Sequence, residues 1–395
     1  MPYNEGVNFD ANSGSTAADI NPAKLPRDPD NGCAPVYPHQ FLKVNTIYEV
    51  AHAAGLRTAV SDKHPSYEIL NGPSGTGIDD FYSPEFNAAK KDIAKIIVND
   101  GLKVTAVLNQ IDGYDHARHE RAGVPAIFGM NFQAANIGQK FSGYVDGAGL
   151  VPESVTTLGA QSGKVPGLSQ ALDFIDAAIG SMVARLASNG LTDSTLLIVT
   201  AKHGNSPVDR STLHTIDPAG FAPLINGVQA GLTAQVTADT VALIWLKDRS
   251  RAAEVAAVLE ANGAAIGAET IFSGAEIETM FDGELAGNAT RHPDVIVEPL
   301  PGVVYTTPGA KWCDHAGFHP DDIHVPLVVV DPGKEPGSVS CAVSLRQIAP
   351  TILHALKLKT GDLDAVRLEH TRKLPRSDED GCVDDGGDDD AAGED

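Results

Sequence analysis

The stretch STLLIVTAKHGNSP, residues 194–207, decides which fold the sequence predicts. Its uninterrupted apolar run at residues 196–199 predicts a buried strand, and the polar residues after it predict a loop that carries His203. Open α/β sheets place their chemistry in polar clusters at the carboxyl ends of buried strands. We therefore expect an α/β protein with a functional site at the end of this strand.

Helical and strand patterns alternate on both sides of this stretch. Residues 167–190 predict a long amphipathic helix that leads directly into the strand, because apolar side chains recur at every third or fourth position. Further strands are expected at residues 57–61, 103–110 and 324–331, and further helices at residues 45–54, 83–101, 131–141 and 344–356. Alternation at this spacing implies right-handed parallel crossovers. The predicted architecture is a three-layer α/β/α sandwich on a mostly parallel sheet.

The pattern changes between residues 209 and 293, which predict an inserted subdomain. Paired strands are expected at residues 232–248, a helix at 250–264 and a short helix at 273–285, and the main sheet is expected to resume at 294–306. The whole chain then divides into an irregular N-terminal arm (1–40), an α/β domain (41–372) that contains the insertion, and an acidic tail (373–395).

The charge distribution limits the classes of partner. The formal net charge is −23, and residues 378–395 contain ten acidic and no basic residues, so we expect this tail to be disordered. The rest of the chain keeps a charge of about −13, which argues against nucleic acid as a partner because phosphate backbones attract Lys and Arg. An anionic substrate stays possible, since a metal ion can invert the local field. No stretch approaches about 18 apolar residues, so no membrane span is expected.

Residues 111–119, IDGYDHARH, form the first of three polar clusters that predict chemistry. Asp112 ends the strand expected before it, and His116 follows four positions later, a spacing that points two ligands at one place if the loop enters a helical turn. Asp115 and His119 have the same spacing, so the pattern does not decide which of the two pairs binds a metal. The alternative to metal binding is a solvated loop. A carboxylate with an imidazole suits zinc or manganese.

The other two clusters also follow or precede apolar strands. The second cluster is the loop that carries His203 after the strand at residues 196–199. His203 is a candidate metal ligand, and the alternative is that it only forms hydrogen bonds within the loop. The segment KWCDHAGFHPDDIHVPLVVV, residues 311–330, contains six potential ligands: Asp314, His315, His319, Asp321, Asp322 and His324. Three histidine-bearing loops at sheet-strand ends together indicate a shared metal centre, which is typical of a metallohydrolase.

The combined motifs resemble the type I phosphodiesterase/nucleotide pyrophosphatase family of the alkaline phosphatase superfamily. In that family a strand ends in Asp-x-x-x-His, a second ends in VT-x-D-H-G, and H-G-G-F precedes D-D-x-x-V-x-L-x-V. Here the corresponding stretches are IDGYDH, VTAKHG and DHAGFHPDDIHVPLVVV, and the likeness covers residues 20–370. It implies an alkaline phosphatase-like fold and metal-dependent hydrolysis of a phosphate ester or nucleotide.

The resemblance also implies site residues. Two metal ions, usually zinc, flank a Ser or Thr nucleophile in that family and clamp the attacking and leaving oxygens. Asp112, His116 and His315 match the ligands of the first metal, and His203 matches one ligand of the second. Residues 62–64 follow another strand end, in a loop that lines the substrate pocket in relatives. Asp62 and Lys63 are therefore substrate-binding candidates, with a solvated turn as the alternative.

Two departures from the family pattern bear on catalysis. Lys202 stands where the family has an aspartate ligand; we expect its ammonium to hold a phosphoryl oxygen as a fixed cation, unless it points out of the site. The family's first strand, which ends in a metal-binding Asp, and the Ser or Thr nucleophile after it have no counterpart before residues 33–55. An inactive, truncated relative that retains the scaffold and one metal, or a phosphomutase-like enzyme, is therefore the alternative. If the true start lies upstream, the resemblance suggests an exported bacterial protein.

Overall fold

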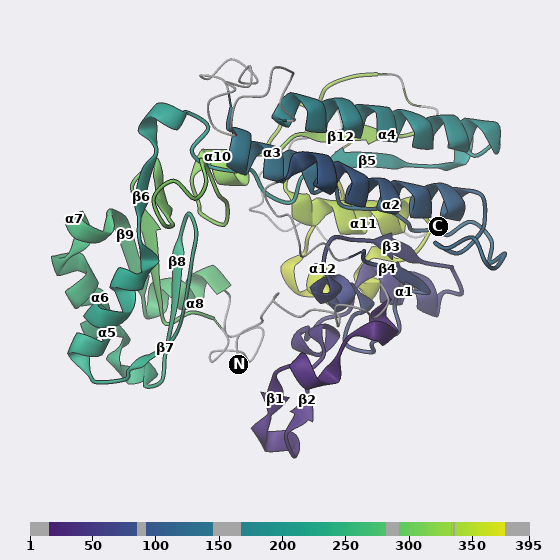
Figure 1. Cartoon of the computed structure of the whole chain (residues 1–395). Coiled ribbons are helices and arrows are strands. Elements are labelled where there is room, and N and C mark those ends of the chain that lie inside the picture. The colour runs from purple at the N-terminus through teal and green to yellow at the C-terminus, as the bar shows by residue number, and fades with distance from the viewer. Residues whose placement is uncertain are drawn as a thin grey trace.

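The computed structural model describes residues 16–84, 92–144, 167–281, 292–332, 334 and 336–375, and its elements gather in two groups (Figure 1). The first group contains α1 (Ile47–Ala53), β3 (Ala59–Ser61), β4 (Asp80–Tyr82), α2 (Ile93–Ile111), α3 (Ala134–Ser142), α4 (Leu168–Ser188), β5 (Leu197–Thr200), β12 (Leu327–Val330), α11 (Ile348–Ala355) and α12 (Asp364–Glu369). The short strands β1 (Arg27–Asp28) and β2 (Ala34–Pro35) form an antiparallel pair that projects from this group. The predicted acidic tail lies almost wholly outside the described residues.

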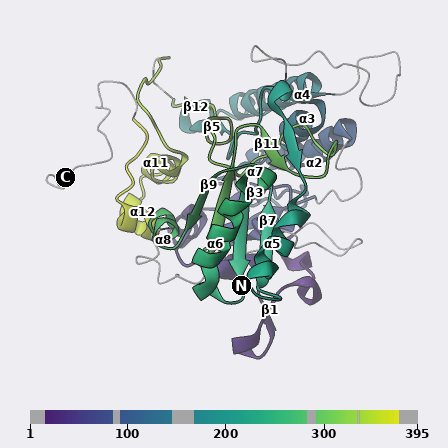
Figure 2. The same cartoon turned by 90° about the vertical axis from the view of Figure 1, so that its left-hand side faces the viewer.

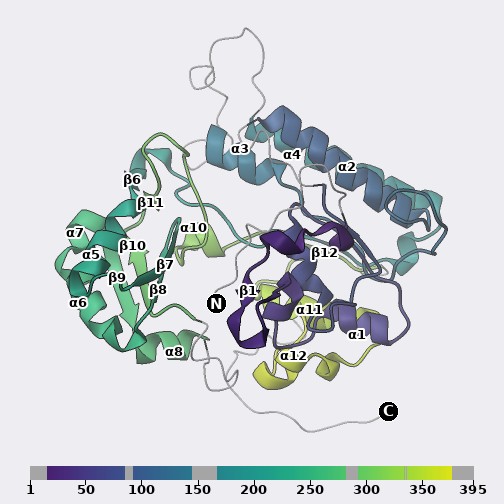
Figure 3. The same ribbon diagram turned by 60° about the horizontal axis from the view of Figure 1, so that its bottom comes forward.

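Helices cover both sides of the β5–β12 pair. Helices α2, α3 and α4 lie on one side, and α11 lies on the other (Figures 2 and 3). The first three helices pack on one another through a buried apolar cluster: Ile93, Ile96, Ala134, Ile137 and Ala171. This arrangement follows from the apolar stripes of the sequence, because an amphipathic helix gains stability by burying one face. The α/β class is confirmed.

Helix α2 corrects one prediction. Residues 103–110 were expected to form a strand, but they continue the helix to Ile111, and Gly101 lies inside it. The apolar positions of the supposed strand keep the helical spacing of three or four residues, and Val104, Val107 and Ile111 are buried. A glycine inside a helix costs about 1 kcal/mol relative to alanine. Burial of this longer stripe outweighs that cost, so Asp112 ends a helix rather than a strand.

The mostly parallel sheet is not resolved as one continuous ladder among the described residues. Strands β3 and β4 pair in parallel, and residues 126–131 run parallel to β3 on its other side. Strand β5, however, pairs with β12 in the antiparallel sense. A cavity of about 1110 Å³ lies between segment 126–131 and β5, and consecutive residues of both segments line it. Consecutive residues of a strand point to opposite faces of a sheet. A cavity that touches all of them therefore borders the edge of each segment, not one of its faces.

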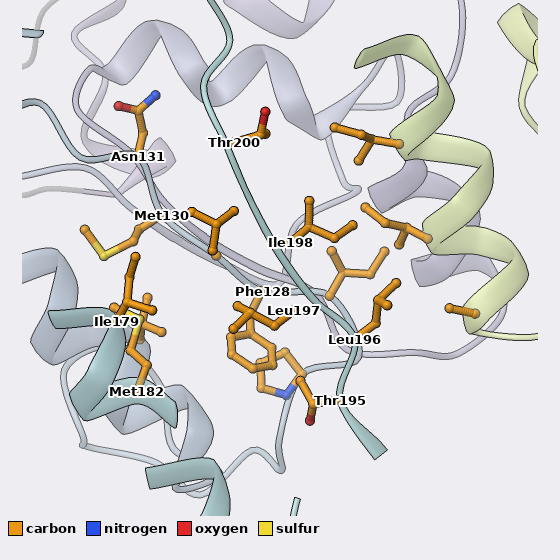
Figure 4. Close-up of a pocket in the computed structure, with 18 of the residues that line it drawn as sticks. Phe128, Met130, Asn131, Ile179, Met182, Thr195, Leu196, Leu197, Ile198 and Thr200 are labelled. Atoms are coloured by element: carbon orange, nitrogen blue, oxygen red, sulfur yellow. The ribbon is translucent and has the colours of Figure 1, made fainter. Parts of the chain in front are cut away.

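Figure 4 shows how apolar side chains fill the wall of this cavity. The labelled apolar residues are Phe128 and Met130, Ile179 and Met182 of α4, and Leu196, Leu197 and Ile198. The polar residues Asn131 and Thr200 stand at one end of the same view. Thr195 stands at the opposite end of the view, so the cavity has an apolar interior and polar residues at both ends, one of which is formed by the carboxyl ends of the two flanking segments.

The second group has its own antiparallel sheet. Its elements are β6 (His214–Ile216), α5 (Phe221–Val228), β7 (Thr233–Ala238), β8 (Ala242–Leu246), α6 (Ala252–Ala261), α7 (Gly263–Ile266), β9 (Ala268–Ser273), α8 (Ala275–Phe281), β10 (Val295–Pro299) and β11 (Val303–Tyr305). The strand order is β7-β8-β10-β9, and helices α5 and α6 cover one face (Figure 2). The predicted paired strands and helices of this region are confirmed.

Strands β10 and β11 correct a second prediction. Residues 294–306 were expected to return to the main sheet, but Val295 pairs with Ile244 of β8 and Ser273 of β9. Strand β11 pairs in parallel with β6. A short apolar run predicts a buried strand without indicating which sheet buries it. The division of the chain into an arm, an α/β domain with an insertion at 209–293, and a tail stays a prediction.

Strand β12 leaves apolar side chains at the surface. Val328, Val329 and Val330 are 54%, 39% and 52% exposed, although they form one continuous apolar run. Strand β5 lies on one edge of β12, and no other strand among the described residues pairs with it. Within the described residues, no helix is both long and apolar enough to cross a membrane.

Candidate functional site

Three segments bring predicted site residues to the polar end of the cavity. Asp62 and Lys63 follow β3, Lys202 and His203 follow β5, and His315 lies in the loop before β12. Lys63, Lys202 and His203 all line the cavity. The polar cluster expected at the carboxyl end of β5 therefore includes the ends of two strands and a third loop.

The imidazole rings of His203 and His315 lie against each other. Their centroids are 3.8 Å apart, and their planes are tilted by 37°. Nδ1 of His203 lies 2.7 Å from the carbonyl oxygen of Gly204. Because a carbonyl oxygen only accepts, Nδ1 carries the proton and Nε2 keeps its lone pair.

Both rings are neutral at pH 7. Burial, followed by the positive charges of nearby lysines, lowers the pKa of His203 to about 4. The same two causes lower the pKa of His315 to about 2, with the neighbouring His203 adding to the effect. The lysines that act on both rings are Lys63, Lys140 and Lys202.

The buried carboxylate beside these rings is already balanced. Oδ1 of Asp314 lies 3.9 Å from Nε2 of His315, which alone would raise the pKa of that imidazole. However, the same carboxylate forms ion pairs with Lys140, at 2.5 Å, and with Lys311. Lys311 also pairs with Asp239 at 2.8 Å, so these two ammonium groups are shared by two carboxylates.

Asp62 and Lys63 are both buried directly after β3. The backbone N–H of Lys63 donates to Oδ1 of Asp62 at 2.6 Å. Burial raises the pKa of Asp62, and the charges of Lys103, Lys63 and Lys202 oppose that rise. Lys63 lines the cavity, and a substrate-binding role for Asp62 and Lys63 stays a prediction.

Lys202 reaches across the site rather than along the β5 loop. Its ammonium donates to the hydroxyl of Tyr67 and lies 5.1 Å from the centre of that ring. Its side chain is exposed to solvent, and its charge opposes the rise in the pKa of Asp62 and lowers the pKa of His203 and His315.

The loops that carry the two histidines are held together by backbone contacts. Ser206 and Asp314 exchange hydrogen bonds of 2.7 and 2.9 Å, and the N–H of Gly204 donates to the carbonyl oxygen of Asp322 at 2.6 Å. The hydroxyl of Ser206 donates to the buried carboxylate of Asp322 at 2.7 Å. Asp322 therefore joins the loops rather than facing the rings.

The remaining candidates of this segment have other contacts. Asp321 accepts a hydrogen bond from the N–H of Val208, His319 donates to the carbonyl oxygen of Pro299, and His324 is exposed.

Asp112 and His116 do not join this cluster. Asp112 accepts hydrogen bonds from Arg118 at 2.8 Å and Arg185 at 2.6 Å, and Arg118 is the main reason that its pKa is lowered to about 2. His116 pairs with Asp80 at 2.5 Å and stacks on Tyr82 at 4.7 Å between centroids. Each side chain is thus engaged by partners of its own.

This separation bears on a metal centre. The two-metal arrangement implied by the resemblance needs Asp112, His116 and His315 at one ion. Within the part of the chain that the structure describes, no group of three or more His, Cys, Asp or Glu residues is placed to hold a metal ion. The described donor set at the cavity is two imidazoles beside lysines. Imidazoles suit zinc, but two are fewer than the three protein ligands of a catalytic zinc site, and ammonium groups repel a cation.

Asp112→Asn is expected to lower the free energy of unfolding by about 0.5–1 kcal/mol, because its arginine partners are partly exposed. The pKa of Asp112 is below its ordinary value, so the ion pairs stabilise the fold above pH 4 and lose their effect as the pH falls through about 2. The difference between variant and wild type should therefore shrink in acid. Urea unfolding at pH 7 and pH 3 measures it. An unchanged stability combined with loss of bound metal would instead support the ligand role.

Sequence reasoning missed four residues near the site. These are Tyr67, which accepts from Lys202; Lys103, which acts on Asp62; Asn131, whose carbonyl oxygen accepts from Lys103; and Lys140, from α3. Asn131 ends the apolar run 126–130 after Pro125, a pattern that could have predicted a strand. Lys103 and Lys140 lie on helices, where single lysines give no signal.

Comparisons with known proteins find a matching family model and similar solved structures. A family model described as type I phosphodiesterase/nucleotide pyrophosphatase matches residues 34–322. Murine ectonucleotide pyrophosphatase/phosphodiesterase 5 is 15% identical, with a TM-score of 0.51 over 80% of this chain and 70% of that chain. An inactive variant of that murine protein in complex with AMP gives 15% identity and a TM-score of 0.50 over 79% and 70%. Phosphonoacetate hydrolase from Sinorhizobium meliloti 1021 is 18% identical, with a TM-score of 0.40 over 80% of each chain. A comparison with curated protein sequences found no match.

Proposed function

Because the chain belongs to the type I phosphodiesterase/nucleotide pyrophosphatase family of the alkaline phosphatase superfamily, we propose that it hydrolyses phosphate esters at the polar end of the cavity. The observation that carries this proposal is the pair of neutral imidazoles, His203 and His315, set among lysines at the carboxyl ends of β3 and β5. The three-layer arrangement on a mostly parallel sheet is part of the same proposal.

The residues of the chain have complementary roles in this proposal. Lys202 and Lys63 hold phosphoryl oxygens, since ammonium groups bind them by charge-assisted hydrogen bonds. Nε2 of His203 accepts a proton from the water whose oxygen attacks phosphorus, because Nδ1 is already committed to Gly204. The ester P–O bond breaks, and the leaving alcohol oxygen takes a proton from solvent. The substrate is a small phosphate ester or a nucleotide; the complex of the murine relative with AMP supports the nucleotide class.

No step of this proposal involves a metal ion. Members of the family are typically metal-dependent, and zinc or manganese was the expected cofactor. The four predicted ligands Asp112, His116, His203 and His315 divide between two places in the fold, so the described residues give no binding set through which a step could be written.

His203→Ala tests the proposal. A base with so low a pKa gives a rate enhancement at or below the lower limit usual for general-base catalysis. We therefore expect kcat of His203→Ala to fall by roughly tenfold to a hundredfold. Hydrolysis of bis-p-nitrophenyl phosphate by the full chain, with and without added zinc or manganese, provides the measurement. The control is His324→Ala, because His324 is exposed and lies in the same segment as His315.

A second function is favoured because Asp112 and His116 lie apart from the adjacent rings of His203 and His315. A chain with this arrangement can keep the phosphoryl-binding end of the cavity without turnover. If the wild-type chain shows no hydrolysis with any added metal, the protein is a binding protein on an enzyme scaffold, and the hydrolytic proposal is withdrawn.

A further inference from the structure

We infer that the cavity between segment 126–131 and β5 is a binding site for one extended apolar peptide strand, which pairs with the edges of both flanking segments. The strand occupies the body of the cavity, so its binding is independent of hydrolysis beside His203. The partner is a polypeptide segment of about five consecutive apolar residues with polar residues on both sides.

The segment that runs beside β3 turns half of its backbone groups toward the cavity. The carbonyl oxygens of Ile127 and Gly129 accept hydrogen bonds from β3, and the N–H of Asn131 donates to β3. Backbone groups of alternate residues point to opposite edges of a strand, so those of Phe128 and Met130 point away from β3. Among the described residues, neither Phe128 nor Met130 forms a hydrogen bond with another backbone group. Such an edge is a template for a further strand.

Strand β5 provides a second edge across the cavity. It pairs with β12, and the described part of the chain places no strand on its other side. Both flanking segments line the cavity over consecutive residues, and they run in the same direction, with Asn131 and Thr200 at one end (Figure 4). One inserted strand would therefore join β4, β3 and segment 126–131 to β5 and β12 in a single sheet.

The cavity has apolar walls above and below this gap between the edges. Ile179 of α4 lines it on one face, and Ile352 of α11 lines it on the other. A strand with helices on both faces carries a continuous apolar run rather than alternating residues. Polar residues stand at both ends of the cavity, Thr195 at one and Thr200 at the other, and they limit the run to about five residues at about 3.3 Å each.

The burial of β5 is incomplete, although its sequence predicts a buried strand. Leu197, Ile198 and Val199 are each only partly buried, whereas residues 295–297 of β10 in the second group are all fully buried. Each Å² of apolar surface removed from water contributes about 25 cal/mol. An inserted apolar strand would gain this free energy in addition to backbone hydrogen bonds.

The partner is a segment of another chain. Outside the described ranges, the sequence contains no run of three consecutive apolar residues, and the gap takes about five. A small apolar molecule would cover the side chains but would leave the backbone groups of both edges unpaired. Each buried unpaired group costs about 1–3 kcal/mol, so a peptide backbone complements the cavity better.

A synthetic peptide with the run Val-Ile-Val-Leu-Val between polar ends tests this inference. Hydrogen–deuterium exchange of the full chain is measured with and without saturating peptide. We expect backbone exchange in segments 126–131 and 196–200 to slow roughly tenfold or more, since both edges gain hydrogen bonds. Strand β7 is the internal control, because it is an edge of the other sheet and should exchange at an unchanged rate.

Two matched comparisons separate strand pairing from burial of any apolar body. The same peptide with its backbone nitrogens methylated keeps the side chains but lacks the donors, and it should bind at least roughly tenfold more weakly. In the protein, Met130→Pro removes an N–H that has no backbone partner among the described residues, and it should weaken peptide binding to a similar extent. Met130→Leu keeps the N–H and a similar volume, so it should bind as the wild type does.

Three results would overturn the inference. They are unchanged exchange in segments 126–131 and 196–200, equal slowing at β7, and equal binding of the methylated peptide. The comparison of the two peptides uses the wild-type chain, so it decides the question even if Met130→Pro does not fold.

Discussion

Lys103→Met is expected to lower the free energy of unfolding by about 3–5 kcal/mol. Lys103 and Asp100 lie one turn apart on α2, and both side chains are fully buried, with the ammonium 2.8 Å from Oδ1 of Asp100. The ammonium also donates to the carbonyl oxygen of Asn131. Methionine fills a similar volume but leaves a buried carboxylate without its cation, which is far more costly than loss of the pair itself.

The same helix supplies the control. Lys95 and Asp92 form an ion pair of 3.5 Å with 63% and 41% of their side chains exposed. Lys95→Met should therefore change stability by less than about 1 kcal/mol. Urea unfolding of both variants compares a buried and an exposed pair on one element. If Lys103→Met is as mild as Lys95→Met, Lys103 is not the buried cation described above.

Adding Asp100→Asn to Lys103→Met should recover part of the loss, since the uncompensated charge is removed. Recovery should be incomplete, because Asp100 also accepts hydrogen bonds of 2.9 Å from the N–H groups of Gln133 and Ala134 at the start of α3. A double variant as unstable as Lys103→Met would show that packing, rather than the unpaired charge, causes the effect.

Gly204→Ala is expected to disrupt the site and to destabilise the fold by about 1–3 kcal/mol. A Cβ atom at position 204 would lie 1.9 Å from the backbone carbonyl oxygen of Asp321. Backbone cannot rotate away as a flexible side chain can, so the loop that carries His203 must move from the segment that follows His315. We expect phosphate affinity to fall together with stability.

Denaturant unfolding and phosphate titration of the same sample measure both effects. Gly220→Ala is the matched control, because a Cβ atom there meets nothing within 4 Å. If Gly204→Ala binds phosphate normally, the contact between the two loops does not position the rings.

The sequence predicts elements better than it predicts their partners. The run at residues 196–199 and the helical stripe before it are local patterns, and both elements form as expected. The strand prediction for residues 103–110 was wrong. It gave more weight to the β-branched residues and the preceding glycine than to the helical spacing of Val104 and Val107. Residues 294–306 form strands as predicted, but pairing depends on distant residues that no local pattern contains.

The site shows the same limit. Lys63, Lys202 and His203 could be found because each follows a strand, and polar residues at strand ends are a recognisable signal. Asp112 was expected at a strand end only because the helix was predicted to end at Gly101 and a strand to follow it. In the structure Asp112 lies at the end of α2. Lys140 joins the cluster through the packing of α3, and sequence spacing cannot reveal such a contact.

The exposed valines of β12 have a consequence for how the protein behaves at high concentration. Val328, Val329 and Val330 present an apolar strand surface, which in isolation favours contact between molecules. The net charge of −23 opposes that contact, since copies of the chain repel one another in solution. At physiological ionic strength this repulsion reaches only about 8 Å, and added salt shortens it further. Colloidal stability of this protein is therefore maintained by its acidic surface, and it decreases as the salt concentration rises.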